Sequence, residues 1–204
     1  PYISYANCGL PYHLGGVIPE RDSLLVMSEA AFAKRFNVDV RTEAEVNSID
    51  PAAKTVTIRR HGETRVEAYD KLLLATGSSP VKMDIPGLDP ARVMQFWTIP
   101  DMDKAFSKLE AGAKRALVIG AGFIGLEVAE NLRLRGLEVT VVELAPQILL
   151  TIDPEMSSYL AAELARAGIA LRPGHKVISF ENGESYTAVL DDGEKIPTDL
   201  VVMA

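Results

Sequence analysis

Cys8 is the only cysteine of the chain and lies in the stretch SYANCGLPY, residues 4–12. A single cysteine cannot form a disulfide within the chain, and in a soluble domain it is most often a small buried apolar residue. Pro11 and the nearby glycines, however, keep Cys8 out of a regular strand, and a helix start predicted just after it would favour the thiolate. Because the thiolate attacks disulfides and is the form oxidised to sulfenic acid, Cys8 is a candidate redox residue.

A glycine-rich motif, Gly120-Ala121-Gly122-Phe123-Ile124-Gly125, follows an apolar run and opens a predicted helix. In this G-x-G-x-x-G pattern Gly120 allows a tight turn, Gly122 lets the backbone approach a pyrophosphate, and Gly125 lets helix and strand pack closely. Glu143 ends a second apolar run 18 residues after Gly125, where a carboxylate binds ribose hydroxyls and repels a 2′-phosphate. The motif therefore predicts a dinucleotide site that prefers NADH to NADPH. The alternative is that the glycines serve packing alone and that Glu143 is a solvated strand end.

Alternating strands and helices from residue 114 onwards must position this motif. The predicted elements are strands at 114–120, 137–143, 169–173, 176–182, 186–193 and 198–204, and helices at 122–136 and 153–168. Asp153 is placed as an N-cap and Gly168 as the stop of the second helix. This order predicts an α/β fold, a Rossmann-like domain with a central parallel sheet and an attached antiparallel β meander.

The first 113 residues follow a different pattern. A helix over 27–36, capped by Ser28, precedes a β region over 38–75. Residues 69–80, YDKLLLATGSSP, predict a buried strand that runs into a loop, and four prolines between residues 80 and 100 predict a connector. The sequence therefore divides into residues 1–80, a connector of 81–113, and the Rossmann-like domain of 114–204.

The net charge of −7 argues against binding to nucleic acid or to an anionic membrane surface. No apolar run reaches the ~18 residues of a membrane span, and no signal-peptide pattern opens the chain, so the cytoplasm is the expected location. With one cysteine and three histidines far apart in the sequence, we expect no metal site. The chain starts at Pro1 and ends in an apolar strand pattern, which predicts a piece of a longer protein.

Taken together, these segments resemble, in the same order, the FAD-dependent pyridine nucleotide-disulfide oxidoreductases. SYANCGLPY is similar to the redox-cysteine segment, YDKLLLATGSSP to the flavin-side strand, VIGAGFIGLEVAENL to the NADH motif, and DLVVMA to the strand returning towards the flavin domain. The single cysteine resembles the branch of coenzyme A-disulfide reductases, NADH oxidases and NADH peroxidases, and Asn7 before Cys8 is most similar to the first of these. The resemblance implies FAD and NADH as cofactors. It makes residues 1–80 a partial FAD-binding domain without the N-terminal FAD motif, and 114–204 the NADH-binding domain.

The resemblance also implies a thiol site. It places Ser4 and Asn7 near the bound thiol substrate and Arg35 at the phosphates of coenzyme A, although a solvated helix end explains Arg35 equally well. At Trp97 related sequences often carry arginine, so any function of that arginine is in doubt here.

For the cofactors, the resemblance places the Phe123 ring over the flavin and the Glu127 carboxylate near the nicotinamide. Periodicity alone would make Phe123 a core residue and Glu127 a surface residue. The other implied FAD contacts are Val46, at the adenine, and Thr76 and Gly77, in the flavin-side strand. An Ala-Thr-Gly tripeptide is by itself a common loop.

The implied mechanism passes hydride from NADH to FAD and then electrons from the reduced flavin to the sulfur of Cys8. Without a second cysteine, Cys8 must pair with an external thiol, coenzyme A being the natural one, or cycle through sulfenic acid as in an NADH oxidase or peroxidase. A dinucleotide-binding redox sensor without catalysis is a further alternative. The resemblance also implies a parent homodimer, formed through a C-terminal domain that this chain lacks.

Overall fold

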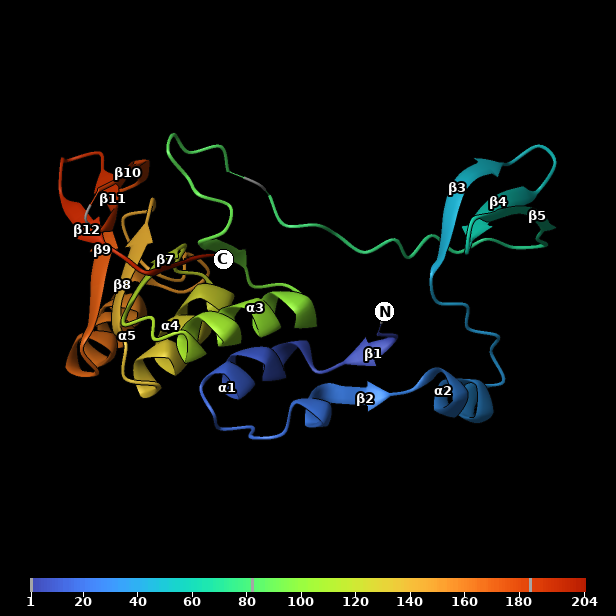
Figure 1. Cartoon of the computed structure of the whole chain (residues 1–204), viewed down its shortest axis with the longest axis horizontal. Coiled ribbons are helices and arrows are strands. Elements are labelled where there is room, and N and C mark those ends of the chain that lie inside the picture. The colour runs from blue at the N-terminus through green and yellow to red at the C-terminus, as the bar shows by residue number, and fades with distance from the viewer. Residues whose placement is uncertain (1, 82, 184) are drawn as a thin grey trace. The chain divides into compact units, whose positions relative to one another are not determined.

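The computed structural model describes residues 2–81, 83–183 and 185–204. They form two compact units (Figure 1), a small unit of residues 2–6 and 25–79 and a large unit of residues 7–24 and 80–204. The segment 7–24, which contains Cys8, therefore packs with the C-terminal part of the chain. The predicted assignment of the chain to flavin-binding and NADH-binding parts remains a prediction. None of the described helices combines the length and apolar character that crossing a lipid bilayer requires.

A five-stranded parallel sheet forms the centre of the large unit, in the order β6-β13-β7-β8-β9. Its strands are β6 (Val93–Gln95), β7 (Arg115–Ile119), β8 (Glu138–Glu143), β9 (Ile169–Pro173) and β13 (Leu200–Met203). Consecutive apolar residues of β7 and β13 are buried, as expected for parallel strands that are covered on both faces. The predicted α/β fold with a central parallel sheet is confirmed.

Helices pack against this sheet and against one another. The helices of the large unit are α1 (Leu10–Leu14), α3 (Ile99–Glu110), α4 (Phe123–Leu134) and α5 (Pro154–Arg166). α4 packs on β7, β8 and β9, and the short α1 packs on both α3 and α4. α3 starts at a capping box, in which the Thr98 backbone N–H donates to the Asp101 carboxylate over 2.8 Å.

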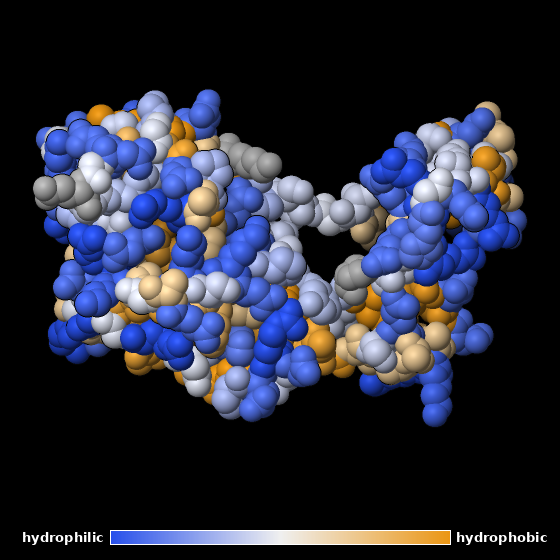
Figure 2. Space-filling view, in the orientation of Figure 1, coloured by the Kyte–Doolittle hydropathy of each residue, from blue (hydrophilic) through white to orange (hydrophobic). Residues whose placement is uncertain are grey.

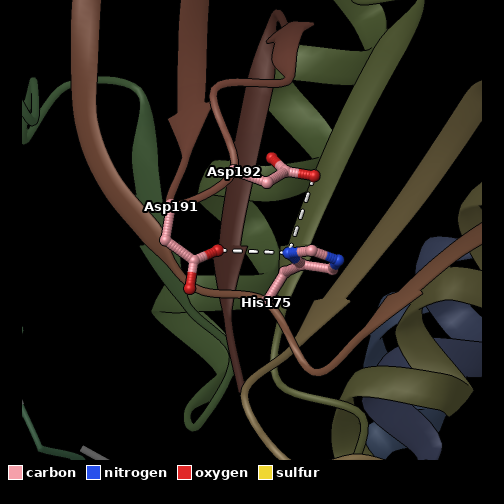
Figure 3. Close-up of side chains that lie close together, drawn as sticks. All are labelled: His175, Asp191 and Asp192. Carbon is pink, nitrogen blue, oxygen red and sulfur yellow. Dashed lines mark hydrogen bonds and ion pairs between the residues drawn. The ribbon is translucent and has the colours of Figure 1, made fainter.

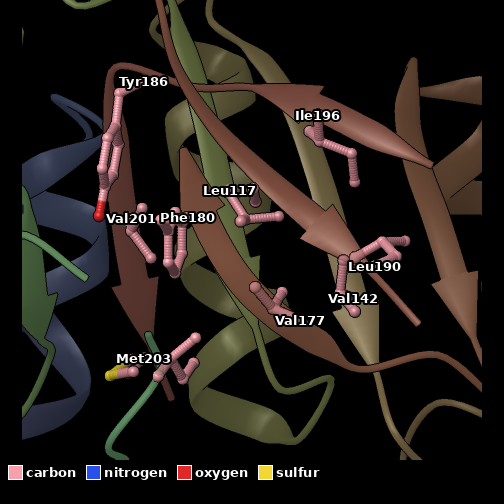
Figure 4. Close-up of a cluster of buried hydrophobic side chains, with 11 residues drawn as sticks. Leu117, Val142, Val177, Phe180, Tyr186, Leu190, Ile196, Val201 and Met203 are labelled. Atoms are coloured by element: carbon pink, nitrogen blue, oxygen red, sulfur yellow. The ribbon is translucent and has the colours of Figure 1, made fainter. Parts of the chain in front are cut away.

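An antiparallel meander covers part of the sheet. It consists of β10 (Val177–Asn182), β11 (Tyr186–Leu190) and β12 (Lys195–Pro197). Figure 4 shows the cluster that joins the two layers, with Leu117, Val142 and Val201 from the parallel strands against Phe180 and Ile196 from the meander. Burial of these side chains provides the main attraction between the layers. The predicted antiparallel meander is therefore confirmed.

The small unit is built from short elements: β1 (Ser4–Tyr5), β2 (Leu25–Met27), α2 (Glu29–Phe36), and the meander β3 (Ala44–Asp50), β4 (Thr55–Arg60) and β5 (Glu63–Ala68). Ser28 caps α2 as predicted, its Oγ accepting from the Ala31 backbone N–H over 3.2 Å. His61 and Gly62 both have positive φ, the conformation of a tight hairpin turn between β4 and β5. Figure 2 shows mostly hydrophilic residues on the visible face of each unit, interrupted by exposed apolar residues.

Two expectations for the middle of the chain are wrong. Residues 69–80 form no strand, and Leu73 and Leu74 are exposed, because no described strand lies beside this segment to pair with it. Residues 81–113 are more than a connector, since they contain β6 and α3. The prolines that suggested a connector lie before β6 and in the first turn of α3, where proline is tolerated.

Candidate functional site

Cys8 lies in a 3-10 turn, Asn7–Gly9, that leads directly into α1. The thiol is free and the residue is exposed. Pro11 occupies the first turn of α1, where its missing N–H costs no hydrogen bond. The sequence correctly excluded a regular strand at Cys8. The sequence also placed the cysteine just ahead of a helix, and α1 begins at Leu10, two residues after Cys8.

A pocket of about 410 Å³ in the large unit brings the cysteine segment and the glycine-rich motif together. Cys8 and Asn7 lie on its wall with Phe123 and Glu127, which come more than 110 positions later in the chain. The other lining residues are Leu10, Pro11, Tyr12, Phe96, Trp97 and Ile124. The pocket is therefore largely apolar and aromatic, with one thiol, one amide, one phenol and one carboxylate at its wall.

Tyr12 lies beside the Glu127 carboxylate in this pocket. The Glu127 carboxylate, as an acceptor for the phenol O–H and through its negative charge, raises the pKa of Tyr12. Oε2 of Glu127 is buried and has no hydrogen-bond partner among the described residues. Sequence reasoning missed Tyr12 because nothing in the pattern around it indicates that α1 packs on α4.

The glycine-rich turn has the geometry that its motif predicts. Gly120 has φ of +106°, and a Cβ there would collide with the carbonyl oxygen of Ala204. A Cβ on Gly125 would collide with the carbonyl oxygen of Gly120, so this glycine allows α4 to start close to the turn. A Cβ on Gly122 would meet no atom within 4 Å, which leaves open space at the N-terminus of α4. The binding of a pyrophosphate in that space remains a prediction.

Glu143 holds the glycine-rich turn through backbone hydrogen bonds. Its Oε2 accepts from the Ala121 N–H over 2.7 Å, and its Oε1 accepts from the Ala145 N–H over 2.8 Å. The Ala121 carbonyl in turn accepts from the Leu149 N–H over 3.0 Å. Each carboxylate oxygen keeps a second acceptor position, so these bonds are compatible with the predicted binding of ribose hydroxyls. Sequence analysis missed these backbone hydrogen bonds because the motif spacing identifies Glu143 but not the groups that it contacts.

The remaining predicted site residues belong to the small unit. Val46 and Thr76 line one groove of about 580 Å³, and Gly77 follows with positive φ. Ser4 lines a different pocket, beside the N-terminus of α2. Arg35 lies in the last turn of α2, with its guanidinium 5.4 Å from the centroid of the Phe36 ring. The cofactor and substrate functions of these residues remain predictions.

A histidine and two aspartates lie together at the end of the meander (Figure 3). Nδ1 of His175 is 3.2 Å from Oδ1 of Asp191 and 3.7 Å from Oδ2 of Asp192. The three could reach a common cation, which the sequence analysis did not anticipate. The backbone N–H of Lys176 and the His175 ring lower the pKa of Asp191, so its carboxylate already has protein partners. We therefore interpret this group as a contact that joins two loops.

Comparison with known proteins finds similar sequences over most of this chain. A family model described as pyridine nucleotide-disulphide oxidoreductase matches residues 2–204. An NADH oxidase of Methanocaldococcus jannaschii is 35% identical over 99% of this chain and 46% of its own length. A coenzyme A disulfide reductase of Staphylococcus haemolyticus is 33% identical over 88% of this chain and 41% of its own length. The chain thus spans less than half the length of these relatives.

Solved structures show the same similarity. The structure of reduced CoADR-RHD from Bacillus anthracis has a TM-score of 0.93 and 40% identity, covering 100% of this chain and 37% of that one. An NAD-dependent persulfide reductase from A. fulgidus has a TM-score of 0.93 and 37% identity, covering 100% of this chain and 38% of that one.

Proposed function

Because the chain belongs to the pyridine nucleotide-disulphide oxidoreductase family, we propose that it is the part of an FAD- and NADH-dependent reductase that carries the redox cysteine. The substrate that fits best is a disulfide or persulfide of coenzyme A. One observation carries the proposal: Cys8 lies on the wall of the same pocket as Phe123 and Glu127. A thiol beside a dinucleotide motif is the arrangement that electron transfer from NADH to sulfur needs.

The pocket at Cys8 suits the ring of a flavin. Phe123, Trp97 and Ile124 provide an apolar wall, and the volume of about 410 Å³ accommodates a planar fused ring. In the small unit, Val46, Thr76 and Gly77 would contact other parts of FAD. Bound FAD would supply the two-electron chemistry between a nicotinamide and a sulfur.

NADH would bind at the start of α4. The backbone N–H groups in the first turn of α4 have no partner within the helix and suit a pyrophosphate, and the absent Cβ of Gly122 leaves the space for it. Glu143 would accept hydrogen bonds from the ribose hydroxyls while it holds the turn in shape. Its negative charge disfavours the 2′-phosphate of NADPH.

Cys8 would carry the thiol chemistry. Its thiolate attacks one sulfur of a coenzyme A disulfide, so that a Cys8–coenzyme A disulfide forms and one thiolate leaves. Two electrons originating from NADH then break this new bond, and the second thiol is released after protonation while the Cys8 thiolate is restored. Asn7 lies beside Cys8 and could position the substrate. Ser4 and Arg35 are the further proposed substrate contacts.

A second candidate function is that of an NADH oxidase or peroxidase. The similarity to the Methanocaldococcus NADH oxidase favours it, as does the exposure of Cys8. In this case the Cys8 thiolate attacks a peroxide, becomes a sulfenic acid and releases water or hydroxide. Two electrons from NADH then return it to the thiolate with loss of a second water.

Anaerobic titration of the full-length protein with NADH distinguishes these functions. We expect the first equivalent to reduce a Cys8–coenzyme A disulfide and release coenzyme A, measured as free thiol, before the flavin absorbance falls. With Cys8→Ser the flavin should bleach at the first equivalent and no thiol should leave. The protein titrated with buffer alone gives the blank for thiol release.

Two other results would change the assignment. If wild-type protein consumes the extra equivalent and releases no thiol, Cys8 cycles through sulfenic acid and the second function holds. If wild type and Cys8→Ser titrate alike, Cys8 exchanges no electrons with the flavin and both functions fail.

A further inference from the structure

The C-terminal end of α1 packs against α4 with no space to spare. Gly15 closes α1 with φ of −71° and ψ of −13°, a helical conformation that residues with a side chain also adopt. A Cβ on Gly15 would nevertheless collide with Oδ1 of Asn131, and it would lie 2.9 Å from Cγ and 3.0 Å from Cβ of the same residue. The close approach of the Asn131 side chain, and not the backbone conformation, therefore requires a glycine here.

The Asn131 side chain is itself fixed by α4. It is 1% exposed, and its Nδ2 donates to the Glu127 carbonyl, one turn earlier, over 2.8 Å. Its Oδ1 is buried and accepts no hydrogen bond from a described residue. Because a buried acceptor without a donor costs free energy, an amide is not the side chain that stability alone would favour at this contact. Asn131 presents a buried surface of fixed shape, against which the last turn of α1 packs.

Contacts on the other side of α1 oppose any movement away from α4. The helix packs on α3 as well as on α4, and both of its leucines are buried. The His13 ring stacks on the Phe106 ring of α3, with the ring centroids 5.5 Å apart. Nδ1 of His13 also donates to the Ile18 carbonyl over 2.7 Å, which holds the following loop against α1. A group inserted between Gly15 and Asn131 must therefore displace α1 as a whole.

We propose that Asn131 is a positioning residue for the Cys8 thiol: its contact with Gly15 sets where α1 lies on α4, and so how far the thiol stands from the dinucleotide motif across the pocket. Cys8 lies in the turn that leads directly into α1, and this helix has only five residues, so a shift at Gly15 reaches the thiol. Asn131 is not among the described residues that line the pocket, and it acts through α1. This inference rests on the proposed function, because it takes Cys8 as the redox residue.

The test is a double-mutant cycle on the full-length, FAD-loaded protein, measured as reduction of coenzyme A disulfide by NADH. Gly15→Ala places a methyl group against the amide, and we expect it to lower kcat at least about tenfold, because a displacement of about 1 Å can cost that much. KM for NADH should stay within about twofold, since the glycine-rich motif is unchanged. Asn131→Ala should lower kcat about threefold, because the cavity that it leaves lets α1 shift. In the double variant the new methyl group occupies the space of the missing amide, so kcat should stay within about twofold of Asn131→Ala.

Gly183→Ala is the matched control, because an added Cβ there comes no closer than 3.9 Å to another group and no left-handed φ is involved. Its kcat should equal that of the wild type. Multiplied losses in the double variant would overturn the proposal, as would a wild-type kcat for Gly15→Ala or a KM for NADH that rises as kcat falls. If Gly15→Ala does not fold, Asn131→Ala decides: the expected loss of kcat supports the proposal, and a wild-type kcat overturns it.

The proposed function fails separately. If the wild-type protein reduces no coenzyme A disulfide, the placement of the thiol is measured by the rate at which iodoacetamide alkylates Cys8, followed by mass spectrometry of the peptide that contains it. Gly15→Ala should change this rate at least about threefold, and the double variant should return it to the rate of Asn131→Ala. Equal alkylation of Gly15→Ala and the wild type would show that the contact with Asn131 does not place the thiol.

Discussion

The Glu143 carboxylate accepts two backbone hydrogen bonds and keeps acceptor positions for the proposed ribose contacts. It holds Ala121 and Ala145 by their backbone N–H groups, and it is the proposed partner of the ribose hydroxyls. An amide in its place would direct N–H donors at one of those backbone donors. The turn and the ribose site are therefore expected to respond together to a change at this residue.

Glu143→Gln is expected to weaken NAD⁺ binding about tenfold, because a donor facing the Ala121 or Ala145 N–H breaks a charge-assisted bond. The dissociation constant, measured by calorimetry on the full-length protein, tests this expectation. Glu138→Gln, at the exposed start of the same strand, is the control and should bind NAD⁺ normally. Normal NAD⁺ binding by Glu143→Gln would show that the hydrogen bonds between Glu143 and the turn do not affect the dinucleotide site.

At the scale of elements, the two glycines at the start of α4 have different surroundings. Gly125→Ala places a methyl group against the Gly120 carbonyl oxygen, and we expect it to cost about 1–3 kcal/mol of stability. Gly122→Ala meets no protein atom and should unfold like the wild type, while NAD⁺ binding falls at least tenfold because the methyl group enters the proposed phosphate space. Urea unfolding and calorimetry measure the two effects. The interpretation of the turn is wrong if the two variants behave alike.

The segment 7–24 is held to the rest of the large unit by apolar burial more than by charge. Leu14 and Leu24 are fully buried, whereas the bidentate Arg21–Asp103 pair, at 2.7 and 2.8 Å, is partly exposed. We expect Leu14→Ala to lower the free energy of unfolding by about 2–5 kcal/mol, and Asp103→Asn by less than about 1 kcal/mol. Chemical denaturation of both variants tests this order. A larger loss for Asp103→Asn would mean that the ion pair anchors the cysteine segment.

For the whole molecule, several carboxylates of the large unit make its stability depend on pH. Hydrogen bonds from Arg115 lower the pKa of Asp199, those from Arg172 lower the pKa of Glu194, and those from Arg21 lower the pKa of Asp103. A lowered pKa in the folded state means that the stabilisation is present above the ordinary values of 3.8 and 4.5 and is lost as the pH falls through the folded-state pKa.

We therefore expect urea midpoints that are constant near neutrality and fall below about pH 4.5. Asp199→Asn should be less stable than the wild type at pH 7, and the difference should shrink towards pH 3 because the wild-type carboxyl is protonated there. A constant difference over this range would show that Asp199 stabilises the fold by packing and not by its charge.

The location of the protein in the cytoplasm and the dimeric state of the parent protein both remain predictions.

Much of the large unit could be predicted from local pattern alone. The apolar runs ending at Ile119 and Glu143, the glycine motif between them and the caps of the later helices depend on neighbours within a few residues, so a single sequence suffices to find them. The same locality identified Cys8 as unsuited to a strand. Local pattern fails where a strand forms only by pairing with a distant strand. Residues 69–80 have the pattern of a buried strand, yet no described strand lies beside them.

The sequence by itself determined the kinds of residue available for chemistry: one thiol, one dinucleotide motif and one strand-end carboxylate. Only the tertiary structure decided that the thiol and the motif share a pocket, that Tyr12 and Glu127 line it together, and that Glu143 accepts a hydrogen bond from the glycine-rich turn. These contacts join residues from about 20 to more than 110 positions apart. They follow from how α1 packs on α4 and how β8 lies beside β7, and no periodicity within either segment encodes that packing.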